Sequence, residues 1–257
     1  MRRFIISAIA ATTLTSLALS QTSTYYLTAG DQSTNWAAQG GSALFSWGQS
    51  AGGGEYPIAV SGDIRTIGGG AGSMGGQYTL GGTFTGVTYT STALGAMYDG
   101  TTDGRLNYGV DFAAGGVYSF DRDWQNATLL FAPTASSQYL GITYDTSDDG
   151  IWVSSWGTGQ IEHYSKTGSF LGSWSSGMTF VASLAYDPAD GTLWMQEWLD
   201  AGHFVQYDRF GNKLSDVNYN MAGMNTLGGE FNIVPEPATL ALLGAGLAAM
   251  ARRRKKN

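Results

Sequence analysis

The chain contains no cysteine, and only 13% of its 257 residues are charged. Without thiols it can form neither a disulfide nor a thiolate metal site, an absence compatible with export but no proof of it. Long amphipathic helical patterns are also missing between the two ends. What is abundant is glycine, with 38 residues, beside a hydrophobic content of 43%. This turn-rich composition, with enough apolar residues for a core, indicates one or two all-β domains.

Basic side chains are scarce in the body of the chain. The net charge is −7, but seven of the 13 basic residues lie at the termini. Residues 21–233 therefore carry 19 acidic and six basic side chains, a net charge of −13. An acidic body repels phosphate backbones, so this composition disfavours nucleic acid as a partner.

Residues 139–174 form the clearest structural unit. They divide into four short stretches rich in β-forming residues, with turns near residues 145–150, 157–159 and 166–168. Asp and Ser side chains in the first turn can bond nearby backbone amides. Four strands of about five residues joined by tight turns predict an antiparallel meander.

Related units lie on both sides, at a period of 42 to 46 residues. A Tyr-Asp pair marks each unit, and a large apolar residue follows eight positions after each tyrosine. The tyrosines are Tyr98, Tyr144 and Tyr186, and the apolar residues are Leu106, Trp152 and Trp194. Residues 41–47 also match residues 168–174 at five of seven positions, at an offset of 127. A four-stranded repeat of about 40–50 residues is typical of a β-propeller blade.

We therefore predict an all-β fold, a β-propeller of about five four-stranded blades in residues 21–233. The N-terminal piece, residues 25–47, lacks a first and a second strand, while residues 225–233 form a strand without a blade. Pairing of these two pieces would close the ring and remove exposed sheet edges. Six blades are the alternative, if the glycine-rich residues 68–76 contain further strands.

The first 20 residues have the three parts of a secretory signal peptide. Arg2 and Arg3 form a basic start, residues 4–19 are apolar, and Ala18-Leu19-Ser20 fits a small-x-small cleavage site before Gln21. We expect a signal helix in residues 1–20, with a short buried helix as the alternative.

The last 24 residues also differ in composition from the body of the chain. Pro235 and Pro237 cannot continue a sheet, because proline lacks an amide hydrogen and fixes φ. Residues 238–251 are 14 apolar or small residues, and five basic residues follow: Arg252, Arg253, Arg254, Lys255 and Lys256. A helix of this length reaches ~21 Å, short of a ~30 Å hydrocarbon core, although snorkelling basic stems could extend it. The basic cluster favours the cytoplasmic face.

This arrangement closely resembles the PEP-CTERM sorting signal: Val-Pro-Glu-Pro, an apolar helix, then an arginine-rich end. The resemblance covers residues 234–257 and makes Pro235, Glu236 and Pro237 the recognition residues. It implies an exported protein, held at the inner membrane of a Gram-negative bacterium and cleaved near this motif by an exosortase. The hosts of such proteins make extracellular polysaccharide, and propeller ectodomains also occur ahead of such tails. The alternative is a plain C-terminal membrane anchor.

Four tryptophans are the candidate ligand platform. Trp152 and Trp156 are spaced i, i+4 on one predicted second strand, and Trp194 and Trp198 repeat the pattern 42 residues later. Such spacing turns both rings of a pair to one sheet face. The rings could stack on sugars, or they could fill the space between blades. The corresponding positions in the preceding unit are Leu106 and Val110.

Metal and nucleotide sites have weaker patterns. Asp145, Asp148 and Asp149 are candidate calcium ligands, although aspartate in a β-turn more often serves the turn itself. His163 and His203 fall at different repeat positions, which disfavours a zinc site. Residues 70–75 satisfy G-x-G-x-x-G, but a strand pattern follows where a dinucleotide site needs a helix, so we expect a flexible loop. No cofactor is expected.

Together these patterns predict three parts: a signal peptide (1–20), a propeller ectodomain (21–233) and a sorting and anchor segment (234–257). We expect a binding or structural protein of the cell surface or extracellular matrix, without enzymatic activity. Its partners would be the export machinery, the exosortase, the membrane through the C-terminal helix, and extracellular polysaccharide. The alternative is a propeller-type lyase or hydrolase acting outside the cytoplasm, which would need histidines and carboxylates converging at the channel mouth.

Overall fold

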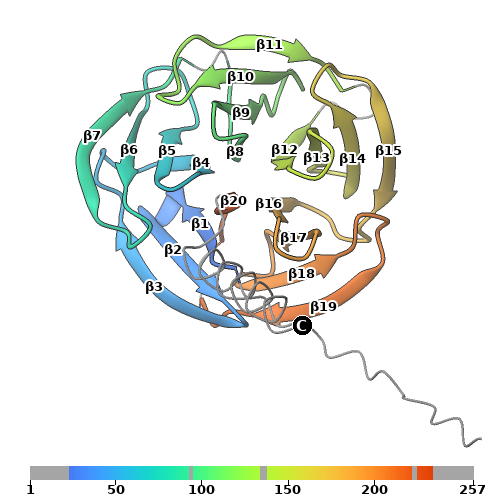
Figure 1. The fold of residues 1–257 in the computed structure, drawn as a ribbon. Coiled ribbons are helices and arrows are strands. Elements are labelled where there is room, and N and C mark those ends of the chain that lie inside the picture. The colour runs from blue at the N-terminus through green and yellow to red at the C-terminus, as the bar shows by residue number, and fades with distance from the viewer. Residues whose placement is uncertain (1–22, 93–94, 134–137, 222–224, 234–257) are drawn as a thin grey trace, which may run out of the picture.

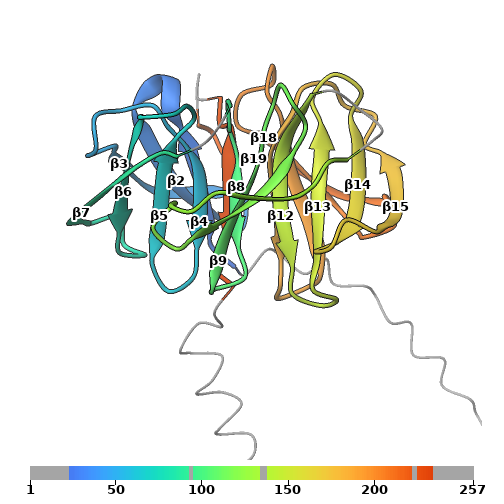
Figure 2. The same cartoon turned by 90° about the horizontal axis from the view of Figure 1, so that it is seen from above.

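In the computed structural model, which describes residues 23–92, 95–133, 138–221 and 225–233, five four-stranded antiparallel sheets surround one axis (Figure 1). Each sheet is a blade whose first strand lies nearest the axis. Seen across the axis, the turns gather at the two ends of the ring (Figure 2). The all-β propeller of five blades is confirmed, and the six-blade alternative is wrong.

The blades follow one another along the chain, here named A to E and given from the axis outward. Blade A comprises β20 (Gly228–Phe231), β1 (Tyr25–Ala29), β2 (Thr34–Gln39) and β3 (Ser42–Gly48), with a short 3-10 helix η1 (Gly30–Gln32) between β1 and β2. Blade B comprises β4 (Glu55–Val60), β5 (Ile64–Gly68), β6 (Met74–Tyr78) and β7 (Phe84–Thr90). Blade C comprises β8 (Gly100–Thr102), β9 (Leu106–Val110), β10 (Val117–Asp121) and β11 (Thr128–Phe131). Blade D comprises β12 (Tyr139–Asp145), β13 (Gly150–Ser155), β14 (Gln160–Ser165) and β15 (Phe170–Ser175). Blade E comprises β16 (Val181–Asp187), β17 (Thr192–Glu197), β18 (His203–Tyr207) and β19 (Lys213–Asn218).

Strands from both ends of the chain close the ring. β20 pairs antiparallel with β1, and Phe231 lies opposite Tyr25. The predicted pairing of residues 225–233 with residues 25–47 is therefore confirmed. One detail was wrong: the N-terminal piece supplies three strands of blade A and lacks only the innermost one.

The predicted equivalence of Tyr98 with Tyr144 and Tyr186 is wrong. The backbone amides of Tyr144 and Tyr186 donate to Thr101 and Thr143 Oγ1, each at 2.9 Å, so these two tyrosines hold matching places in β12 and β16. Tyr98 instead precedes β8, where Thr102 takes the matching place opposite Asn107. The turn between β8 and β9 is two residues shorter than the corresponding turns of blades D and E. The strand positions of blade C are therefore shifted relative to its Tyr-Asp pair.

Aromatic rings join neighbouring blades near the outside of the ring. A ring on the fourth strand of one blade meets a tyrosine on the third strand of the next. The centroid distances are 6.0 Å for Trp47 and Tyr78, 5.1 Å for Phe131 and Tyr164, and 5.0 Å for Trp174 and Tyr207. Trp47 and Trp174 come from the two matched segments, so that match was a true repeat. Such pairs contribute about 0.5–1.5 kcal/mol each beyond the area they bury.

The carboxylate of Asp99 lies at the axis and ties four inner strands together. Its Oδ1 accepts bonds from the amides of Gly100 and Gly229, each at 2.9 Å. Its Oδ2 accepts from the amides of Ile142 at 3.2 Å and Leu184 at 3.0 Å. Asp99 is fully buried, and this burial raises its pKa, an effect that the four amides oppose. The donors belong to blades C, D, E and A, so one side chain links most of the ring.

Ion pairs join the blades at the end of the ring where first and second strands meet in Asp turns. They link Asp63 with Arg122 at 3.1 Å, Asp103 with Lys166 at 2.9 Å, and Asp145 with Arg209 at 2.9 Å. Each basic residue lies just after the third strand of the next blade. At the seam between blades E and A, Asp187 occupies the position of the acidic residue. Gly40, just after β2, occupies the position that a lysine or arginine has at these other seams. No lysine or arginine within the described ranges pairs with Asp187.

Both described ends of the chain lie at this Asp-turn end. The Ser23 hydroxyl donates to Asp187 Oδ1 at 2.7 Å, and the Ile233 amide donates to Val60 O at 3.4 Å. The predicted signal helix (1–20) and C-terminal helix (238–251) lie outside the described residues. Within the part that the structure describes, no helix is long and apolar enough to span a membrane.

Candidate functional site

The opposite end of the ring opens into a cavity of about 280 Å³ on the axis. Inner strands begin at this end and second strands finish there, so every blade contributes a residue to the lining. The lining residues are Asp31, Tyr56, Tyr98, Phe112, Leu140, Trp156, Trp198 and Leu227. We call this opening the aromatic mouth.

Three rings of the aromatic mouth occupy one repeated position. Trp156 follows directly after β13, Trp198 directly after β17, and Phe112 two residues after β9. In each case the second strand ends at the channel, and the large side chain that follows it lines the opening. The corrected register makes Phe112, and not Val110, the counterpart of Trp156 in blade C, and it likewise makes Tyr108 the counterpart of Trp152.

The rings form a continuous belt across four blades. The centroid distances are 5.5 Å between Tyr56 and Tyr98, 5.4 Å between Tyr98 and Phe112, 6.1 Å between Phe112 and Trp156, and 5.8 Å between Trp156 and Trp198. All five are partly exposed and pack on the buried residues Leu140, Ala182 and Leu227. The belt is a preformed apolar surface that solvent and ligands can reach.

One carboxylate stands at the rim of the mouth. The Tyr56 hydroxyl donates to Asp31 Oδ1 at 2.6 Å, and Asp31 itself is exposed. Burial, together with the bond to Asp31, raises the pKa of Tyr56 to about 12. Tyr56 therefore stays neutral at physiological pH, and the exposed Asp31 carboxylate can also accept from an external donor such as a hydroxyl or an ammonium group.

The four predicted tryptophans do not form a single platform. Trp152 is 3% exposed, stacks on His163 at a centroid distance of 3.9 Å, and donates through Nε1 to Asp145 Oδ2 at 3.0 Å. Trp194 is 1% exposed and packs in the core between blades. The packing alternative holds for these two residues, whereas Trp156 and Trp198 lie beyond the strand ends, where strand alternation no longer fixes their direction.

The predicted calcium cluster is rearranged by a basic side chain. Asp145, Asp148 and His163 offer ligand atoms within 4.8 Å of one another. Arg209 ion-pairs with both carboxylates, its Nε lying 2.9 Å from Asp145 Oδ2 and its Nη2 against Asp148. Asp149 turns away to Lys166, at 2.9 Å. A cation at this place would have to displace Arg209, so the arrangement disfavours calcium binding.

The two histidines lie apart from the aromatic mouth. Burial lowers the pKa of His163, which stacks on Trp152 at the other end of the sheet. His203 pairs with Asp200 at 2.8 Å and with Asp216 at 2.9 Å on the outer part of blade E. Neither is among the described residues that line the mouth, and Asp31 is the single carboxylate among those residues.

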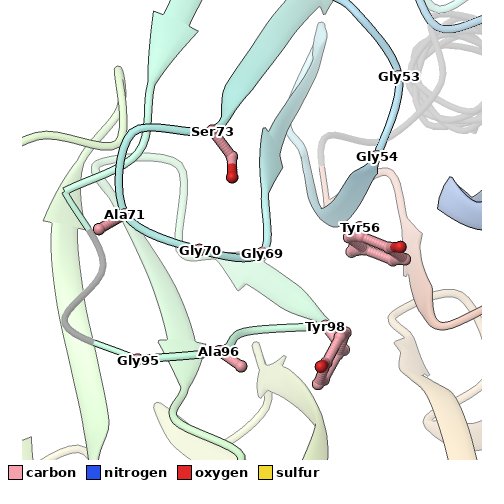
Figure 3. Close-up of a pocket in the computed structure, with 10 residues that line it drawn as sticks. All are labelled: Gly53, Gly54, Tyr56, Gly69, Gly70, Ala71, Ser73, Gly95, Ala96 and Tyr98. Atoms are coloured by element: carbon pink, nitrogen blue, oxygen red, sulfur yellow. The ribbon is translucent and has the colours of Figure 1, made fainter.

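A second cavity of about 460 Å³ adjoins the mouth and shares Tyr56 and Tyr98 with it. Figure 3 shows these two side chains on one side and small residues around the rest. The small residues are Gly53, Gly54, Gly69, Gly70, Ala71, Ser73, Gly95 and Ala96. We call this space the glycine groove. It includes part of the predicted flexible loop, residues 70–75, of which Met74 and Gly75 instead belong to β6.

Comparison with known protein families decides what the C-terminal segment is. Residues 234–255 match the family model of the PEP-CTERM protein-sorting motif. The protein is a PEP-CTERM sorting-motif protein. The motif implies an exported protein that is sorted to the cell surface and processed by an exosortase. Its residues, Pro235, Glu236 and Pro237 among them, lie outside the described part of the structure.

The propeller of this PEP-CTERM protein is similar to one further family model and to several solved structures. Residues 98–197 match the SMP-30/gluconolactonase/LRE-like region, and no curated protein matches the chain. A chain in the crystal structure of a nidogen/laminin complex is 11% identical, with a TM-score of 0.57, over 82% of this chain and 98% of that one. A Bacteroides thetaiotaomicron protein of unknown function is 14% identical, with a TM-score of 0.56, over 81% of this chain and 64% of that one. Myxococcus xanthus glutaminyl cyclase is 12% identical, with a TM-score of 0.51, over 66% of this chain and 73% of that one. At these identities the likeness shows the fold alone.

Proposed function

We propose that this PEP-CTERM protein is a non-enzymatic carbohydrate-binding protein of the cell surface or extracellular matrix, and that the aromatic mouth is its binding site. The belt from Tyr56 to Trp198 is the observation that carries the proposal. The C–H faces of a pyranose are apolar, and they gain dispersion and hydrophobic energy on a flat aromatic ring while their hydroxyls stay in water. A concave apolar lining with few polar groups is the usual form of a small-molecule site.

Charge narrows the class of sugar. The lining residues within the described part of the chain include Asp31 but no lysine or arginine, and residues 21–233 carry a net charge of −13. A uronic-acid or sulfated chain would approach against this field. The site instead suits a neutral sugar or an amino sugar, whose ammonium group would be attracted both by Asp31 and by the aromatic faces.

The position of the chain ends gives the mouth an orientation. Ser23 and Ile233 lie at the Asp-turn end, while the mouth opens at the other end. Attachment of residues 234–257 to a membrane or cell surface would therefore leave the mouth facing outward. This orientation suits a protein that binds matrix polysaccharide from the cell surface.

The test is a binding assay on full-length protein purified in mild detergent, against neutral, amino-sugar and uronic-acid polysaccharides. We expect binding to a neutral or amino-sugar chain, with at least tenfold weaker affinity in Trp198→Ala. Phe210→Ala is the matched control, because Phe210 is 85% exposed at the Asp-turn end. Equal losses in both variants, or no binding to any chain, would refute the proposal.

The same assay distinguishes the lyase or hydrolase alternative. Hydrolysis of a glycosidic bond ordinarily needs two carboxyl groups on opposite sides of it. A mouth with a single carboxylate among its described lining residues should therefore not hydrolyse the polysaccharide. Chromatography of the ligand after long incubation should show no shorter products, and their release by wild type but not Asp31→Asn would favour the enzyme.

A further inference from the structure

We propose that the ligand is an internal segment of a linear polysaccharide, which crosses the aromatic mouth and leaves the ring over blade B through the glycine groove. This inference rests on the proposed function and adds the way in which the chain runs. A site that receives a chain end or a free monosaccharide needs one closed cavity, whereas a site for an internal segment must be open on two sides.

The two cavities adjoin at a pair of tyrosines. Tyr56 and Tyr98 line both, and their rings meet edge to face at a centroid distance of 5.5 Å. A sugar unit stacked near Tyr98 in the mouth would therefore have its neighbour in the glycine groove. Together the two cavities extend the site well beyond the room that one unit needs.

The opening exists because blade B lacks an aromatic residue at the repeated position. Gly69 follows directly after β5, as Trp156 follows β13 and Trp198 follows β17. A Cβ at Gly69 would lie 2.6 Å from Met97 O and 3.3 Å from the Tyr56 ring. Sterics therefore exclude a side chain at this position, and the groove beside it stays lined by small residues.

The walls of the groove suit a polyhydroxylated chain. Glycine and alanine at residues 53–54, 70–71 and 95–96, all at least partly exposed, place no larger side chain over the backbone, so sugar hydroxyls can approach it closely. Figure 3 shows these segments on different sides of the groove, with Ser73 as the hydroxyl side chain among them. The groove thus offers polar contacts after the apolar contacts of the mouth.

Gly70 offers a way to block the groove without disturbing the fold. A Cβ there would meet a single neighbouring atom, Ser73 Oγ at 3.7 Å, which is ordinary contact. Gly70→Phe should therefore fold normally and fill the groove. Gly172→Phe is the matched control, because Gly172 lies in β15 with nothing within 4 Å of its Cβ position.

The experiment measures the affinity of full-length protein for a ladder of oligosaccharides, from a disaccharide to a decasaccharide, cut from the polysaccharide that binds. Wild-type affinity should rise with length beyond the shortest oligomer that binds, and Gly70→Phe should lose about tenfold for the longest oligomers while keeping its affinity for the shortest. Trp198→Ala should weaken the binding of every length, and Gly172→Phe should match wild type.

Two results separate this inference from the function on which it rests. Length-independent binding, or Gly70→Phe affinity within twofold of wild type for the decasaccharide, overturns the internal-segment inference while the mouth remains the site. Failure of the wild type to bind any oligosaccharide or the parent chain overturns both. Melting curves of Gly70→Phe within a few degrees of wild type establish that a loss is not misfolding.

Discussion

Replacing Asp187 with asparagine should stabilise the folded protein near neutral pH. Asp187 ends β16 at the seam between blades E and A, and it is 1% exposed. Its Oδ1 accepts from the Ser23 hydroxyl and the Ala189 amide, while its Oδ2 is buried without a hydrogen-bond partner in the described part of the chain. Burial raises the pKa of Asp187 to about 6, and these two hydrogen bonds only partly oppose the shift. An ionised Asp187 therefore opposes folding.

The sign and size follow from the two pKa values. Because the folded pKa of about 6 exceeds the ordinary value of 3.8, the folded state binds the proton more tightly than the unfolded state does. The stability that this proton provides is lost as pH rises through about 6. At ~1.36 kcal/mol per pKa unit the full cost is about 3 kcal/mol, of which about 2 kcal/mol develops between pH 4.5 and 7.5.

The assay is urea unfolding of wild type and Asp187→Asn at pH 4.5 and 7.5. The stability of the variant relative to wild type should increase by about 2 kcal/mol between the two pH values. Comparing the variant with wild type cancels the pH-dependent contributions of the other titrating groups to stability. His163 is one of them: burial lowers its pKa, so its contribution to stability changes with pH in the opposite direction. A relative stability that is the same at both pH values would refute the reasoning.

Asp103→Asn is the matched control, because Asp103 has the same place in blade C but pairs with Lys166. Burial alone would raise its pKa, but hydrogen bonds from the Leu106 amide and Lys166 lower it to about 2. The ion pair stabilises the fold above the ordinary pKa and is lost only as pH falls toward 2. Because solvent screens part of this pair, the variant should be about 1–2 kcal/mol less stable at pH 7.5. Destabilisation of Asp187→Asn by a similar amount would mean that Asp187 has a basic partner after all.

Three further predictions follow from the fold, the seams and the sorting motif. Asp99→Ala removes the acceptor of four buried amides, so it should lower the free energy of unfolding by at least about 3 kcal/mol, or prevent folding; a urea midpoint close to wild type would contradict this. Gly82→Ala should destabilise the protein by about 1–3 kcal/mol, because a Cβ at this positive-φ position would lie 2.8 Å from the Trp47 ring; an unchanged melting temperature would speak against the packing between blades A and B. Intact mass of the protein from a host with its exosortase should lack Arg252–Asn257, and Glu236→Ala should retain them; retention in both would argue against processing.

The number and closure of blades could be predicted because they rest on turn chemistry that recurs. Asp and Gly mark the end of each inner hairpin, and the offset between residues 41–47 and 168–174 counts three blades. The register of blade C could not be predicted in the same way, because a turn two residues shorter leaves the Tyr-Asp signal intact while moving the strands. Tyr98 therefore looked like Tyr144 but lies at the mouth.

The tryptophan spacing predicted which positions are equivalent, but not which rings are exposed. Spacing placed Trp156 and Trp198 at equivalent positions, and the structure brings them together at 5.8 Å. Their i−4 neighbours are buried because they still belong to the strands, whose alternation directs them between blades. Phe112, 44 residues before Trp156, carried a usable signal that the assumed register hid. Tyr56, Asp31 and the axial role of Asp99 depend on contacts between distant blades, which no local pattern encodes.

The most direct test of the account is a crystal structure of the protein with a decasaccharide of the polysaccharide that it binds. We predict sugar rings stacked on Trp156 and Trp198, with further units passing Tyr98 into the groove beside Gly70. Sugar bound elsewhere, for example between Trp174 and Phe210 at the Asp-turn end, with the aromatic mouth empty, would contradict it.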